Sequence, residues 1–212
     1  MNRMPYLQRF KRPLQFLFLL WALQLAHSTL FPDMGRFGIF PREIWGLRGI
    51  VLAPLIHGSW QHLLSNSVPF LVMSFFFISF YPRVASRAFI MIYLLTGLGV
   101  WLFAGRAFHI GLSGVIYGMV SFIFWSGVFR RNAKSIALAL AVLVLYSGYF
   151  YGLVPKERIS WESHLIGSLI GIFAAFWYRE TPEPDEEKRE EESEEEKRYF
   201  LPRNIFDQPK NE

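Results

Sequence analysis

The chain has 212 residues, of which 52% are hydrophobic and 18% aromatic, and its mean hydropathy is +0.25. A soluble domain of this length does not need 22 Phe and 7 Trp, so the composition indicates a membrane protein with several spans. The sequence contains no cysteine, which excludes disulfides and thiolate metal sites.

The net charge of +5 is unevenly distributed along the chain. Residues 1–179 carry 16 Lys and Arg against 4 Asp and Glu, whereas residues 180–212 carry 6 against 13. The basic residues stand at the ends of apolar runs, with no basic stripe on a polar domain. This pattern suits orientation in a lipid bilayer and argues against a nucleic-acid partner.

In chain order, residues 1–13 form a polar, basic N-terminus. The apolar run that follows, 14–31, is predicted to be a first span, because no small-residue cleavage site for a signal peptide follows it. Residues 32–53 are rich in Gly, Pro, Arg and aromatic residues, which predicts a long connection lying at the membrane interface.

Five more apolar runs follow, each near the roughly 20 residues that a bilayer requires. They cover residues 54–81, 88–104, 110–129, 135–154 and 159–178, the last two joined by Pro155-Lys156-Glu157-Arg158. The fold class predicted is an all-α membrane protein with a six-transmembrane-helix bundle over residues 14–178. The acidic tail, 179–212, is expected to be disordered or loosely helical, with no chemistry assigned to it.

Lysine and arginine counts in the short loops predict the orientation. With the N-terminus inside, the inner segments hold ten basic residues and the outer segments six. Both termini are then cytoplasmic, and a prokaryotic inner membrane is the expected location.

This orientation places three polar residues at similar depth near the outer side of the bilayer. His62 lies about two turns into the second span, and Ser113 and His164 lie about one turn into the fourth and sixth. Polar residues at such positions tend to face a protein interior or a water-filled cavity. Asn66 shares a helix face with His62, and Tyr117 with Ser113, because each pair is four residues apart.

Glycines predict how the fourth and sixth spans meet. Gly114 and Gly118 lie beside Ser113, and Gly167 and Gly171 share a face with His164. Small residues at this spacing let two helices approach closely. If these faces meet, His164 comes within reach of Ser113.

The pattern predicts Ser113 as a nucleophile and His164 as its general base. Backbone N–H groups at the start of the fourth span, near Leu112, together with the Asn66 amide and the His62 imidazole, would form an oxyanion hole. No acidic residue lies deep in a span, so a Ser-His dyad is expected, with Tyr117 holding the imidazole ring by packing.

These residues resemble the rhomboid family of intramembrane serine proteases. The resemblance rests on Gly111-Leu112-Ser113-Gly114, on His62-Leu63-Leu64-Ser65-Asn66 and on His164-Leu165-Ile166-Gly167, over roughly residues 14–178. It implies a bundle that cleaves transmembrane segments of other membrane proteins near their outer end, with His57 as a further histidine of the site. No cofactor, metal or nucleic acid is expected, and the partners are substrate segments and the lipid bilayer.

One departure from the family pattern lies in the first loop. Many members carry an adjacent Trp-Arg pair there, whereas this chain has Trp45-Gly46-Leu47-Arg48. Two other functions are considered. One is a catalytically inactive rhomboid-like protein that binds transmembrane clients. The other is a transporter or channel, which would predict deeper charges or internal repeats, and the sequence shows neither. Ser113 as a packing residue and Asn66 as a helix bridge are the structural alternatives. Substrates and oligomeric state are left open.

Overall fold

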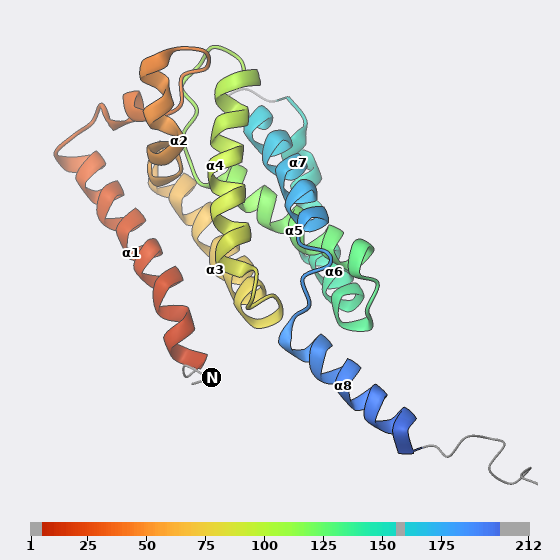
Figure 1. Ribbon diagram of the computed structural model, residues 1–212. Helices are drawn as coiled ribbons and strands as arrows, with labels where there is room; N and C mark the ends of the chain where they lie inside the picture. Colours follow the sequence, from red (N-terminus) through yellow and green to blue (C-terminus); the bar gives the residue numbers. More distant parts are fainter. Residues whose placement is uncertain (1–5, 156–159, 200–212) are drawn as a thin grey trace, which may run out of the picture.

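The computed structural model describes residues 6–155 and 160–199, and its architecture is a helical bundle (Figure 1). The basic residue Arg3, most of the linker Pro155-Lys156-Glu157-Arg158, the start of the sixth run and residues 200–212 lie outside this part. The helices of the bundle are α1 (Tyr6–Thr29), α3 (Trp60–Phe80), α4 (Ala85–Phe103), α5 (Ser113–Arg130), α6 (Ala133–Leu145) and α7 (Trp161–Trp177).

Helix α5 is the centre of the bundle, and α3, α4, α6 and α7 pack around it. Of its most apolar stretch, 56% is buried, compared with 39% for α3 and 33% for α4. Small residues allow α5 to occupy this central position. A Cβ atom added to Gly167 would lie 1.9 Å from the carbonyl oxygen of Gly114, and one added to Gly171 would lie 2.2 Å from that of Gly118. The backbones of α5 and α7 therefore touch, as the glycine spacing predicts.

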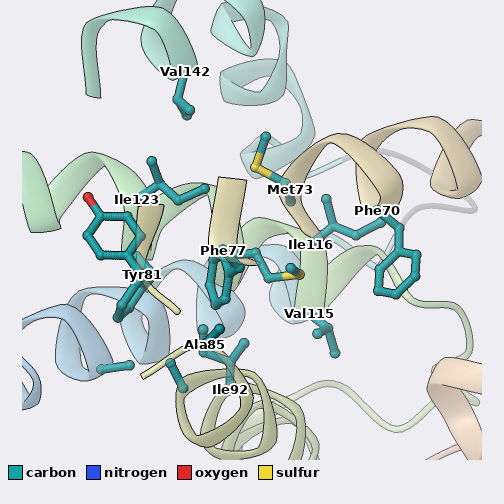
Figure 2. Close-up of a cluster of buried hydrophobic side chains, with 14 of the residues drawn as sticks. Phe70, Met73, Phe77, Tyr81, Ala85, Ile92, Val115, Ile116, Ile123 and Val142 are labelled. Atoms are coloured by element: carbon teal, nitrogen blue, oxygen red, sulfur yellow. The ribbon is translucent and has the colours of Figure 1, made fainter. Parts of the chain in front are cut away.

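The apolar core is formed mainly by α3, α4 and α5, and α1, α6 and α7 also contribute buried residues to it; Figure 2 shows part of this core. Aromatic rings fill its widest part, where the Phe77 and Phe122 ring centroids are 4.9 Å apart and Tyr81 meets Phe122 edge-on at 5.4 Å. Close packing of this kind leaves little room for relative movement of the helices. The core therefore provides a fixed base for the polar residues at one end of the bundle.

The connection between α1 and α3 is built from short helices. These are η1 (Met34–Phe37), η2 (Ile44–Arg48), α2 (Gly49–Leu52) and η3 (Ala53–Leu55). The connection lies against α4, where the Trp101 indole N–H donates to the carbonyl oxygen of Glu43 at 2.9 Å. Ile39 forms an antiparallel bridge with His109, in the segment that leads into α5.

The fifth apolar run is broken. Helix α6 ends at Leu145, and the chain turns by 64° into η4 (Ser147–Leu153), where one continuous segment was expected. Helices α3, α4 and α5 are long and apolar enough to cross a membrane, and the α6–η4 pair would be a fourth span. Helix α1 begins at Tyr6, so it also includes part of the segment expected as a separate N-terminus.

The acidic tail forms helix α8 (Pro184–Tyr199) over its described part (Figure 1), and its first turn binds the end of α5 at Arg130, opposite the end that begins with Ser113. Its acidic side chains meet basic residues at the ends of the spans, in the ion pairs Asp185–Lys134, Glu186–Arg130 and Glu187–Arg83. Beyond this turn the helix extends away from the bundle.

Candidate active site

The nucleophile candidate, Ser113, is the first residue of α5. The chain reaches it through Gly111, whose φ of +103° is a conformation that favours glycine. A Cβ atom at Gly111 would also lie 2.6 Å from the His62 ring. By their position in the first turn, the N–H groups of Ser113 and Gly114 have no intrahelical acceptor.

The imidazole of His164 lies beside Ser113, in the first turn of α7. Its Nε2 is 2.8 Å from Ser113 Oγ, and its Nδ1 is 2.8 Å from the carbonyl oxygen of Gly152 in η4. A carbonyl oxygen only accepts hydrogen bonds, so Nδ1 carries the proton. The bare Nε2 lone pair therefore faces the Ser113 hydroxyl, which donates to it.

Tyr117, one turn along α5, stacks on this imidazole. The ring centroids are 4.1 Å apart and the planes differ by 5°. The Tyr117 hydroxyl donates to the carbonyl oxygen of Tyr149 at 2.8 Å, which places η4 over both rings. The close contact of Gly114 with Gly167 brings the two helices together directly after Ser113 on α5 and one turn after His164 on α7.

Asn66 brings a buried amide to the same site. Its side chain is 4% exposed, and its Nδ2 group has no hydrogen-bond partner. A Cβ atom built on Gly111 would lie 3.8 Å from this Nδ2 and 2.8 Å from His62 Nε2. A buried donor without an acceptor costs stability, so a free amide beside the loop that leads into Ser113 marks a place where an anionic oxygen can be received.

His57 contacts the loop that precedes Ser113. Its ring is 1% exposed, and burial, together with the neighbouring His62, lowers the pKa of His57 to about 3. The ring is therefore neutral at physiological pH, and its Nε2 accepts a hydrogen bond of 3.4 Å from the Leu112 N–H. The Leu112 N–H, expected among the oxyanion donors, is thus directed to His57 in this structure.

The structure brings together all ten residues singled out from the sequence, and it adds two that sequence reasoning missed, Tyr149 and Gly152. Both act through backbone carbonyl oxygens, for which residue type carries no signal. The one sequence feature that points to them is a glycine at the end of the aromatic run 146–151. In the described part of the chain, no group of His, Asp and Glu side chains is arranged to hold a metal ion.

Comparison with known proteins gives a family match. The family model for the Rhomboid domain matches residues 41–181 of this chain. An uncharacterized protein of Mycobacterium tuberculosis is 34% identical over 193 residues, which cover 82% of this chain and 80% of that protein. A relative from Mycobacterium leprae is 32% identical over 177 residues, covering 77% and 68%.

A second kind of relative carries a functional name. The rhomboid protease GlpG of Yersinia enterocolitica is 36% identical over 89 residues, which cover 40% of this chain and 31% of GlpG. The domain match and the apolar helices together make this an integral membrane protein. With two thirds of its length inside the domain match, the chain belongs to the rhomboid family.

Proposed function

We propose that this protein is a serine endopeptidase that cleaves transmembrane segments of other membrane proteins. The observation that carries the proposal is the contact of 2.8 Å between Ser113 Oγ and His164 Nε2, with the imidazole tautomer set by the carbonyl oxygen of Gly152. A serine hydroxyl becomes an effective nucleophile when a base in this geometry takes its proton.

The reaction follows from the positions of these atoms. Ser113 Oγ attacks the scissile carbonyl carbon while its proton passes to His164 Nε2, and the carbonyl oxygen becomes an oxyanion. His164 then gives the proton to the leaving amine as the C–N bond breaks. Water attacks the resulting ester with His164 again as the base, which releases the acid and restores the Ser113 hydroxyl.

The oxyanion would be held by the Asn66 amide, the His62 imidazole and the N–H of Ser113. The free Nδ2 group of Asn66 supports this role, because it is already desolvated and needs no reorganisation to bind charge. The Leu112 N–H would join them only after leaving His57 Nε2, and its long contact of 3.4 Å is weak enough to exchange.

In the bilayer we propose six spans: α1, α3, α4, α5, the α6–η4 pair and α7. The basic residues Arg83, Arg87, Arg130 and Lys134 then lie on the cytoplasmic side with both termini, and Ser113 lies toward the outer side. Because the chain contains no cysteine, single cysteines introduced at Ser28 and Glu192 would report orientation directly. In intact cells, a thiol reagent that does not cross membranes should label the first and not the second.

A substrate segment must unwind near its outer end, because a helix hides its carbonyl groups in internal hydrogen bonds. Small or helix-weakening residues at that place would lower the energy of unwinding. The proposed substrates are therefore single-span proteins with Gly or Ser residues near the outer membrane surface.

A serine-directed fluorophosphonate tests the proposal on the purified full-length chain. Wild-type protein should be labelled and should cleave a reconstituted single-span substrate, whereas Ser113→Ala and His164→Ala should lose both activities. Ser28→Ala is the control, since its exposed hydroxyl only contacts the carbonyl oxygen of Leu25. Cleavage by both dyad variants would refute the proposal, and a wild-type protein that binds substrates without labelling or cleavage would favour the client-binding function.

A further inference from the structure

A further buried histidine, His109, lies outside the Ser113–His164 pair. It is 6% exposed and precedes Ser113 by four residues, in the connection between α4 and α5. Its Nε2 is 3.0 Å from the carbonyl oxygen of Gly105, and its Nδ1 is 2.6 Å from the hydroxyl oxygen of Ser160. Since the carbonyl only accepts, Nε2–H donates to Gly105, and Nδ1 accepts from the Ser160 hydroxyl.

The hydrogen bonds continue into the start of α7. Ser160 Oγ and Ser163 Oγ are 2.5 Å apart, and because the Ser160 proton points to His109, the Ser163 hydroxyl must donate to Ser160. The Ser160 hydroxyl makes no capping bond to its own helix, although it occupies the N-cap position where serine usually does so. Its hydrogen-bonding capacity is used to link α7 to His109.

The hydrogen bond between His109 and Ser160 affects the position of the general base, His164. The carbonyl oxygen of Ser160 accepts the backbone N–H of His164 at 3.3 Å, so the residue held by His109 is part of the turn that carries the imidazole. On its other side, His109 is fixed by two backbone bonds to Ile39, of 2.9 and 3.0 Å. His109 thus joins the segment leading to Ser113 to the first loop through its backbone and to the turn leading to His164 through its ring.

We propose that His109 is a positioning residue, which holds the start of α7 so that His164 Nε2 stays within hydrogen-bonding distance of Ser113 Oγ. The inference rests on the proposed function. The Gly114–Gly167 contact fixes the two helices on one side of the pair, and the His109–Ser160 bond fixes them on the other. Together these two contacts fix the distance between Ser113 Oγ and His164 Nε2, whereas with only one of them the helices could rotate about that contact.

The decisive variants are His109→Leu, which removes both hydrogen bonds, and His109→Gln, whose amide can donate and accept. Misplacement of reacting groups by about 1 Å can cost about 10²-fold in rate, so we expect kcat of His109→Leu to fall 10- to 100-fold. KM should stay within about twofold, because His109 does not touch the substrate. His109→Gln should recover a large part of kcat, a rescue that simple cavity filling would not give.

Ser160→Ala removes one oxygen atom and should reproduce the loss of kcat. The double variant with His109→Leu should be no worse than either single variant, because both remove the same link. Ser28→Ala is again the control, since the Ser28 hydroxyl bonds to the carbonyl oxygen of Leu25 in its own helix and takes no part in the hydrogen bonds that join His109, Ser160 and His164.

Wild-type kcat in both His109→Leu and Ser160→Ala, or additive losses in the double variant, would overturn the positioning role. So would fluorophosphonate labelling of Ser160 in the Ser113→Ala variant, which would make His109 and Ser160 a second reactive pair. Failure of the proposed protease function has a different signature, namely unchanged activity of Ser113→Ala itself.

Discussion

Replacing Gly152 with alanine tests whether η4 orients the catalytic base. A Cβ atom at this position would lie 1.9 Å from the Tyr117 hydroxyl oxygen and 3.1 Å from His164 Nδ1. Ordinary contacts begin near 3.4 Å, so the two groups must separate by about 1.5 Å. Tyr117 has little freedom to yield, because its ring is packed between His164 and Tyr149.

The expected consequence is loss of rate with little loss of fold. Moving η4 away breaks the bond from His164 Nδ1 to the Gly152 carbonyl oxygen and frees the ring to rotate or to change tautomer. Misplacement on this scale predicts a fall in kcat of about 10²-fold. The residues of η4 are at most partly buried, so the thermal unfolding midpoint in detergent should change little.

Gly148→Ala is the matched control, because it lies in the same short helix and an added Cβ would have nothing within 4 Å. Cleavage of a reconstituted single-span substrate gives kcat and KM for both variants, and fluorophosphonate labelling gives the reactivity of Ser113. Full activity of Gly152→Ala, or an equal loss in both glycine variants, would contradict the role assigned to the Gly152 carbonyl oxygen.

Three further outcomes are expected. Asn66→Ala should lower kcat about 10²–10³-fold with little change in KM, measured on the same substrate, and an unchanged kcat would remove Asn66 from the oxyanion hole. Lys134→Asp and Asp185→Lys should each make α8 more accessible to limited proteolysis, and the double exchange should restore protection; if it does not, the pair does not hold the helix. Burial raises the pKa of Glu183, so its contribution to stability is greatest below the ordinary carboxyl pKa and declines as pH rises through the raised value. Glu183→Gln should therefore flatten the pH dependence of the unfolding midpoint, and a profile identical to wild type would exclude this cause.

The sequence predicts the helices and the meeting of α5 with α7, because both depend on local patterns. Apolar runs of membrane length give the helices, and glycines four residues apart on two runs allow close approach. Depth along the spans then places Ser113, His164 and Asn66 near one end of the bundle, and the structure brings them together.

The partner of His164 Nδ1 could not be predicted in the same way. A search among acidic side chains finds no candidate because the partner is a backbone carbonyl, that of Gly152, which every residue type possesses. It reaches the imidazole only because the chain breaks after Leu145, and that break lies in a run whose hydropathy indicates a continuous span. The orientation of the base is therefore a property of tertiary packing.

The attachment of the acidic tail to the bundle could also not be predicted from the sequence, and here the reason is electrostatic. Lys and Arg residues at the ends of spans set orientation during insertion, whereas Asp and Glu contribute little, so a sequence-based interpretation assigns Arg83, Arg130 and Lys134 to the membrane surface. In the structure the same three residues bind the first turn of α8, and the side chain of Arg130 is only 3% exposed. The two roles are compatible, because the acidic segment follows the spans in the chain and its carboxylates pair with the same cations. Helix α8 begins after residue 181, where the Rhomboid match ends, so the attachment joins three basic residues inside the match to a segment outside it.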